Sequence, residues 1–302
     1  MLQFLIDTLL RASDLALVAL GLSMVYGLVK FPNIAHVQYA MLGAYLSFGL
    51  RDAGLTLVPA IAVACVLTGA LTLLLHLLVF RRLLRSGPAI TMIGSLAVAM
   101  LIVAVMQGVA GSFPRMFNLP VTAPWRLSGA MLTPLQATTL SVSLLVLTVF
   151  CIVLFHTRMG RALRALSSNA PLAAASGLNA EGLTRGVAFV SGAVAALGGA
   201  MLALSSGAHI NLGHDLLLPV FAAAILGGLG NPIGAVAGAL LIALTETAVT
   251  NINFGPLLGW FGGGDAMAFM PVSYISAASF LILLLALLFK PYGLFDREVR
   301  RV

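Results

Sequence analysis

Three polar side chains that could contact a small solute fall within one short segment of an otherwise apolar stretch. Asn33, His36 and Gln38 follow Pro32 in the sequence Pro-Asn-Ile-Ala-His-Val-Gln. Amide and imidazole groups at this spacing can bind a polar molecule by hydrogen bonds, and polar groups inside a membrane are costly unless they have a role. The alternative is an ordinary turn at the membrane surface. We predict that the segment interrupts a helix and lines a cavity, since freed backbone groups need protein or water as partners.

Glu246 is an acid within an apolar run, in Leu244-Thr245-Glu246-Thr247. An unpaired charge there would be expensive, so we expect its carboxylate to face the interior of a helix bundle. Two interpretations stay open. Glu246 either contacts a transported ion, proton or substrate, or accepts a structural hydrogen bond from a neighbouring Thr or from the backbone.

Catalytic and metal-binding signatures are missing from the sequence. His209, His214 and Asp215 could approach a metal but lack a clear third ligand, so we expect no metal site. The sequence contains no HExxH motif, no GxSxG motif and no GxxxxGK[ST] phosphate loop. We therefore expect no enzyme activity and no cofactor, and any ATP that drives this protein must bind another chain. Cys65 and Cys151 lie inside apolar runs, which excludes a disulfide framework.

The composition is that of a membrane protein. Of 302 residues, 61% are hydrophobic and 8% are charged, and the mean hydropathy is +1.09. Soluble domains carry roughly a quarter charged residues. A soluble enzyme, a disordered protein and a nucleic-acid binder are thereby excluded. The net charge of +7 is more consistent with a topology signal than with a nucleic-acid partner.

The apolar runs predict an all-α polytopic membrane protein with about eight or nine transmembrane helices in a single domain, 1–302. The candidate spans are 8–29, 33–50, 55–80, 88–111, 134–157, 183–207, 214–229, 232–252 and 270–290. Broken or short helices are expected near 31–38 and 227–234, where Asn is paired with Pro. Two interrupted short segments, one in each half of a chain, are typical of the binding site of a transporter. Gly230, Gly234 and Gly238 recur every four residues, which favours a close helix–helix contact.

Lys and Arg residues predict the orientation, because cytoplasmic loops hold the excess of them. Three clusters belong inside: Arg81, Arg82 and Arg85; Arg158, Arg161, Arg164 and Arg185; and Lys290, Arg297, Arg300 and Arg301. The C-terminus is therefore expected in the cytoplasm. Nine crossings would place the N-terminus outside, whereas eight, with 33–50 turning back, would place it inside. For nine crossings, Arg11 is assigned to an external loop. The number of Lys and Arg residues on each side of the membrane does not decide between nine and eight crossings.

The segment 158–182 is the longest predicted cytoplasmic loop between spans. Basic residues lead into a short Ala-rich stretch that ends at Gly177, a plausible helix stop. Small side chains permit close docking into a groove of another protein. The alternative is a charged connector that only enforces topology.

Several segments together resemble the membrane permease subunits of bacterial branched-chain amino acid ABC importers, the LivH/LivM type. The segments are Gly21–Leu28, Asn33–His36, Met41–Tyr45, Gly160–Ala165 with Asn169, Ala173–Asn179, Ile225–Gly234 and Pro291–Phe295. One position departs from the pattern, because Val37 follows His36 where the family usually has Gly.

The resemblance implies a permease in the bacterial inner membrane that forms a translocation path for branched-chain or related amino acids. Its implied partners are a second homologous permease, two cytoplasmic ATP-binding subunits, a periplasmic substrate-binding protein and membrane lipid. Asn33, His36, Gln38 and Glu246 would line the path. The residues implied in coupling to the ATPase are Arg161, Arg164, Asn169, Pro171 and Gly177. The alternative is a stand-alone secondary transporter or channel with Glu246 as its ion or proton site.

Overall fold

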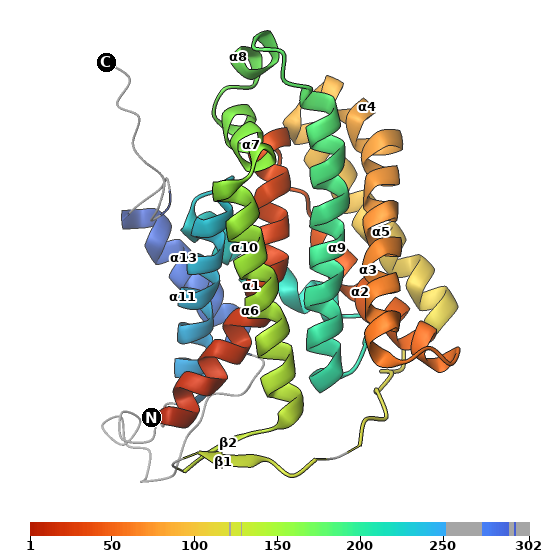
Figure 1. Cartoon of the computed structure of the whole chain (residues 1–302), viewed down its shortest axis with the longest axis vertical. Coiled ribbons are helices and arrows are strands. Elements are labelled where there is room, and N and C mark those ends of the chain that lie inside the picture. Colours follow the sequence, from red (N-terminus) through yellow and green to blue (C-terminus); the bar gives the residue numbers. More distant parts are fainter. Residues whose placement is uncertain (121, 128, 252–273, 290–292, 294–302) are drawn as a thin grey trace.

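The computed structural model describes residues 1–120, 122–127, 129–251, 274–289 and 293 (Figure 1). Within these residues the chain is a bundle of helices with one short β-hairpin, which confirms the all-α membrane fold. Six helices are long and apolar enough to cross a membrane. The basic cluster from Lys290 to Arg301, the segment Pro291–Phe295 apart from Gly293, and the expected position of the C-terminus lie outside the described residues.

The helices match the predicted apolar runs closely. In chain order they are α1 (Leu2–Val29), α2 (His36–Asp52), α3 (Leu57–Leu75), the π-helical turn η1 (His76–Phe80), α4 (Arg81–Leu83), the 3₁₀ turn η2 (Leu84–Ser86), α5 (Pro88–Ala110), α6 (Pro134–His156), α7 (Arg158–Ser168), α8 (Ala170–Ala175), α9 (Ala180–Ser206), α10 (Leu212–Gly227), α11 (Pro232–Asn251) and α13 (Ile275–Phe289). The hairpin pairs β1 (Trp125–Leu127) with β2 (Ala130–Leu132), antiparallel.

The core is built around α1 and α9, which other helices surround. In the most apolar stretch of α1, 78% of the residues are buried within the chain, against 17% for α6. α6 and α5 therefore present mostly apolar side chains to the outside, as helices in contact with lipid do. Figure 1 shows α1 passing through the middle of the bundle.

Small residues bring the central helices into close contact. A side chain at Gly199 of α9 would collide with the backbone carbonyl of Ala40 in α2. A side chain at Gly234 or Gly238 of α11 would collide with the backbone of α10. Glycine permits such approach between membrane helices, where packing and not hydrophobic exclusion drives association. The contact expected from the glycine spacing is confirmed, with Gly230 instead lying beside Gly27 of α1.

The bundle has two distinct ends. α7 and α8 lie at one end, and the hairpin lies at the other, together with the N-terminus (Figure 1). Lys30 Nζ donates to the carbonyl of Ser167 at the first end (3.1 Å), and the backbone N–H of Met131 donates to Gln3 Oε1 at the second (2.8 Å). We call the first the basic end, because its residues include Lys30, Arg81, Arg82, Arg85, Arg158, Arg161, Arg164 and Arg185. The hairpin end holds Arg51, Arg115 and Arg126.

Arg11 lies within the first helix. α1 begins at Leu2, near the hairpin end, and includes Arg11, as the apolar run 8–29 also does. The first helix is therefore longer than the apolar run from residue 8 to residue 29 indicated, and it carries a cation within its length.

Candidate functional site

The first predicted break is present, and the protein itself satisfies the backbone groups that the break frees. α1 ends at Val29, Lys30 adopts a left-handed conformation (φ 55°), and α2 begins at His36. Asn33 is 3% exposed, and its Oδ1 accepts a hydrogen bond from the backbone N–H of Ala35 (3.1 Å). The backbone N–H of Ile34 donates to Ser95 Oγ on α5 (3.0 Å). Asn33 thus shapes the start of α2.

His36 and Gln38 are buried in the contact of α2 with α1 and α10. They are 0% and 7% exposed, and they lie against Gly21 and Gly213 respectively. Among the described residues, neither ring nitrogen of His36 nor Oε1 of Gln38 has a hydrogen-bond partner. Buried polar atoms of this kind are unfavourable until a partner reaches them. In this conformation Asn33, His36 and Gln38 lie together but are closed off from any open channel.

Glu246 lies apart from these three residues, in an ion pair that the sequence analysis missed. Its carboxylate is 2% exposed, and its Oε2 lies 2.6 Å from Nε of Arg11. Ser279 Oγ donates to its Oε1 (2.5 Å). The side chains that contact the Glu246 carboxylate therefore come from α1 and α13, and not from the neighbouring threonines. Arg11 precedes Gly21 by ten residues, which is about 15 Å along a helix.

A signal for Arg11 was present in the sequence. Arg11 stands in the run Leu-Leu-Arg-Ala-Ser-Asp, and a cation within an apolar helix calls for an acidic partner. Asp7, Asp14 and Glu246 were the candidate acids, and the sequence did not single out Glu246. Ser279 offered no signal, because a hydroxyl in a membrane helix commonly bonds to the backbone of its own helix, as Ser279 Oγ also does to the carbonyl of Ile275.

The segment 158–182 forms two short helices joined by a cap. Thr157 Oγ1 accepts from the backbone N–H of Gly160 at the start of α7 (3.1 Å). α7 buries Gly160, Leu163 and Leu166 and leaves Arg161 exposed. Arg164 instead turns back, donating to the carbonyl of Leu154, and so satisfies a free carbonyl at the end of α6.

α8 projects furthest from the bundle at the basic end (Figure 1). Asn169 caps it, because its Oδ1 accepts from the backbone N–H of Leu172 (3.1 Å). Pro171 is exposed in its first turn, where a proline needs no N–H partner. Gly177 ends the segment with φ 83°, and no atom lies near the position of a side chain there. Of the residues predicted to face a partner, Arg164 bonds to the end of α6 and Asn169 caps α8, whereas Arg161, Pro171 and Gly177 are exposed.

An ion pair ties the end of this segment to the bundle. Glu181, in the first turn of α9, lies 2.7 Å from Arg81 of α4 and also bonds to Arg185. These groups are about half exposed, so the pairs contribute little to stability. The pair with Arg81 links the start of α9 to α4.

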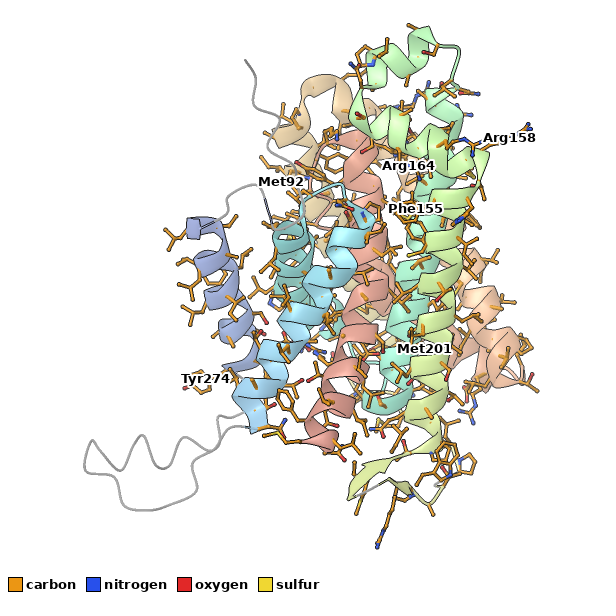
Figure 2. All side chains as sticks on the ribbon, turned by 60° about the vertical axis from the view of Figure 1, so that its left-hand side comes forward. Met92, Phe155, Arg158, Arg164, Met201 and Tyr274 are labelled. Atoms are coloured by element: carbon orange, nitrogen blue, oxygen red, sulfur yellow. The ribbon has the colours of Figure 1, made fainter. Side chains whose placement is uncertain are left out.

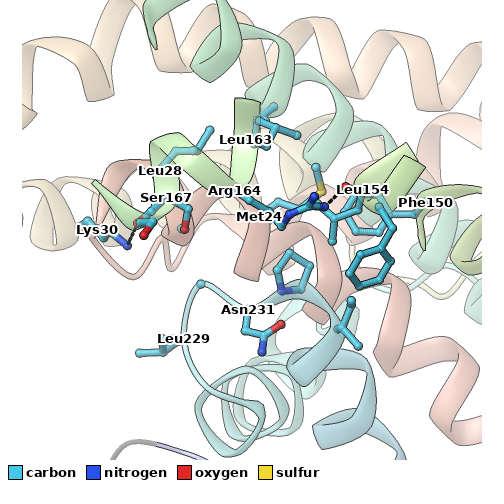
Figure 3. Close-up of a pocket in the computed structure, with 17 residues that line it drawn as sticks. Met24, Leu28, Lys30, Phe150, Leu154, Leu163, Arg164, Ser167, Leu229 and Asn231 are labelled. Carbon is cyan, nitrogen blue, oxygen red and sulfur yellow. Dashed lines mark hydrogen bonds between the residues drawn. The ribbon is translucent and has the colours of Figure 1, made fainter. Parts of the chain in front are cut away.

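A cavity of about 560 Å³ lies beneath α7, which sequence analysis did not predict. Figure 3 shows Arg164 on one side of it and Asn231 on the other, with Lys30 and Ser167 at its edge. Asn231 is the last residue of the second break before α11, and its Oδ1 accepts from the backbone N–H of Gly234 at the start of α11 (3.1 Å). Lys30 of the first break and Asn231 of the second therefore both line this cavity.

His209, His214 and Asp215 were the side chains that could have approached a metal. His209 Nδ1 lies 3.9 Å from Asp215 Oδ2, and within the described ranges no three His, Cys, Asp or Glu side chains form a group able to hold an ion.

A family model described as branched-chain amino acid transport system / permease component matches residues 4–289, almost the whole chain. The chain belongs to this family. LivH of Escherichia coli K12, a high-affinity branched-chain amino acid transport system permease protein, is 28% identical over 322 residues, covering 100% of this chain and 97% of LivH. BraD of Pseudomonas aeruginosa, described in the same words, is 27% identical over 100% of this chain and 98% of BraD. A probable LivH of Methanocaldococcus jannaschii is 28% identical over 93% of this chain and 88% of that relative.

Among solved structures, PsaBC from Streptococcus pneumoniae in complex with Fab covers 94% of this chain and 91% of its own, with a TM-score of 0.46 and 17% identity. The assignment to the branched-chain permease family therefore rests on the sequence relatives. The protein is a multi-pass membrane permease component.

Proposed function

We propose that this permease forms one half of the translocation path of an ABC importer for branched-chain or related amino acids in the bacterial inner membrane. The observation that carries the proposal is the projecting α7–α8 unit of a chain that belongs to the permease family. A capped helix of small, exposed residues suits contact with another protein, because small side chains permit close approach. ATP hydrolysis would take place on two cytoplasmic ATP-binding subunits.

The charge distribution supports the orientation that this assembly needs. Eight of the described basic residues, named above, lie at the basic end and three at the hairpin end. The end with the excess of Lys and Arg faces the cytoplasm by the positive-inside rule. α8 then faces the ATP-binding subunits, and the hairpin end faces the periplasmic substrate-binding protein. Gly293, beside Gly228 at the basic end, supports a cytoplasmic C-terminus.

The proposed path runs beside the start of α2. His36 and Gln38 lie where α2 meets α1 and α10, and their unpaired polar atoms would gain partners when the helices separate. Asn33 lies just before them, at the start of α2. Closure of the ATP-binding subunits would move α8, and through α7 and α9 the helices around these residues. A second homologous permease would complete the path. Glu246 would act at its periplasmic side, since Arg11 lies near the hairpin end of α1.

The test is purification of the tagged chain from native membranes in mild detergent, followed by identification of the bound proteins and by transport in liposomes. We expect an ATP-binding subunit and a second permease to co-purify, and leucine uptake to require ATP inside the liposomes together with the binding protein outside. A chain that purifies alone and transports alone would overturn the importer proposal in favour of a secondary carrier.

A further inference from the structure

The cavity beneath α7 carries two cations and, among its described lining residues, no acid. Lys30 and Arg164 both line it. Lys30 Nζ donates to the carbonyl of Ser167 (3.1 Å), and Arg164 donates to the carbonyl of Leu154. Neither side chain pairs with an acidic group in the part of the chain that the structure describes. A guanidinium has five N–H donors, so Arg164 retains the capacity to bind an anion.

The remaining wall of the cavity is largely apolar. Phe150 and Leu154 of α6 and Met24 of α1 line it and are buried. Asn231 lies across the cavity from Arg164 (Figure 3). Its Oδ1 is used by Gly234, which leaves the amide N–H groups to face a ligand.

The position of the cavity along α6 matches the edge of a bilayer. α6 has 23 residues and is therefore about 35 Å long, slightly more than the roughly 30 Å of a hydrocarbon core. Its last turn, beside Arg164, lies at headgroup depth, and Phe150 lies about a turn and a half deeper. α6 is also the least buried of the long helices, so lipid reaches this side of the bundle.

We propose that this cavity binds an anionic membrane lipid. The phosphate would lie between Lys30 and Arg164 with Asn231 as a polar partner, and an acyl chain would lie against Phe150 and Leu154. Basic pockets between membrane helices on the cytoplasmic side bind lipid headgroups in this way. A free phosphate ion shares the headgroup chemistry, but the apolar wall favours the lipid.

The test is native mass spectrometry of the permease with its co-purifying subunits, after exchange into micelles containing equal amounts of phosphatidylglycerol and phosphatidylethanolamine. We expect selective retention of phosphatidylglycerol. Retention should fall about fivefold in Lys30→Gln, since each cation near a membrane surface contributes about a factor of this size. Lys30→Arg should restore it.

Arg158→Gln is the matched control, because Arg158 is a cation at the start of α7 that does not line the cavity. It should retain as much phosphatidylglycerol as the wild type. Arg164→Gln should lose about as much phosphatidylglycerol as Lys30→Gln. If Arg164→Gln unfolds because it lacks the contact with Leu154, the comparison of Lys30→Gln with Lys30→Arg still tests the proposal. Equal retention of both lipids, equal loss in Arg158→Gln, or complete displacement of the lipid by millimolar inorganic phosphate would each overturn the proposal.

Discussion

Arg11 and Glu246 are opposite charges that neutralise each other inside the helix bundle. The carboxylate is almost fully buried, while Arg11 is 29% exposed toward the hairpin end. Taking such a pair out of water is costly, so the pair is weak evidence for stability, but removing one partner leaves an uncompensated buried charge and is strongly unfavourable. The hydrogen bond from Ser279 extends the same pair to α13.

A double-mutant cycle should reveal this dependence. Arg11→Gln leaves the carboxylate of Glu246 buried without its partner, and this should destabilise the protein by about 3 kcal/mol. This value is the lower end of the range for broken buried ion pairs, because Arg11 is partly exposed. Adding Glu246→Gln should recover much of the loss. The measurement is the thermal unfolding of the detergent-solubilised protein. Arg115→Gln, at the exposed hairpin end, is the control, and a double variant no more stable than Arg11→Gln would contradict the coupling.

At the scale of elements, the close contacts of α9 and α11 with their neighbours depend on residues that lack a side chain. Gly199 meets the backbone of Ala40, and Gly238 meets the backbone of Ala223. A backbone cannot move aside as the end of a flexible side chain can. These crossings therefore fix the distance between α2 and α9 and between α10 and α11.

Gly199→Ala should consequently destabilise the bundle by about 1–3 kcal/mol, as overpacking does. Gly108→Ala is the matched control, since Gly108 lies in α5 with no atom within 4 Å of an added side chain. That variant should be neutral or more stable by up to about 1 kcal/mol, because alanine favours a helix. Thermal unfolding compares the two, and equal losses would show that the α2–α9 contact accommodates a methyl group.

The proposed contact of α8 with the ATP-binding subunits gives a second prediction at the scale of elements. Gly177→Trp should leave membrane insertion intact but uncouple ATP hydrolysis from uptake, because it places a large group where a partner would dock. Gly54→Trp controls for backbone strain, since Gly54 also has a positive φ (101°) and open surroundings but lies in the turn after α2. Both activities are measured in reconstituted liposomes. Uptake and hydrolysis that stay coupled in Gly177→Trp would exclude this role for the segment.

At the scale of the whole molecule, the described helices run between two ends of unequal charge. α1 starts near the hairpin and finishes beside α7, and α2 runs back from the middle of the bundle toward the hairpin end (Figure 2 gives a second view). This arrangement places the N-terminus at the end of the bundle opposite α8.

Thiol labelling tests that orientation. In a background with Cys65→Ser and Cys151→Ser, a membrane-impermeant reagent should label Gly54→Cys in intact cells. Ser168→Cys, at the exposed end of α7, should be labelled only after the inner membrane is permeabilised. Both positions should be labelled equally in detergent if both variants insert normally. In inverted vesicles the pattern should reverse, with Ser168→Cys labelled and Gly54→Cys protected. Labelling of Ser168→Cys in intact cells would reverse the proposed topology.

The sequence by itself determined the class of protein, the helical runs and the two breaks, because these depend on local composition. A run of apolar residues must form a helix in lipid, and Pro with Asn or Gly interrupts it wherever it stands. The sequence also placed Asn33, His36 and Gln38 close together, because they are near one another along the chain. It did not predict that His36 and Gln38 are buried in a closed contact, because that contact depends on Gly21 and Gly213 from other helices.

Only the tertiary structure decided which distant residues meet. Arg11 and Glu246 are 235 residues apart, and no local pattern specifies such a pair. The inward turn of Arg164 was equally hidden, since its partner is a backbone carbonyl, which every residue has. The cavity beneath α7 depends on the convergence of five helices, α1, α6, α7, α9 and α11, with the α10–α11 connection. Hydropathy fixes which segments enter the membrane, whereas the packing of small residues fixes how close they come and which charges they enclose.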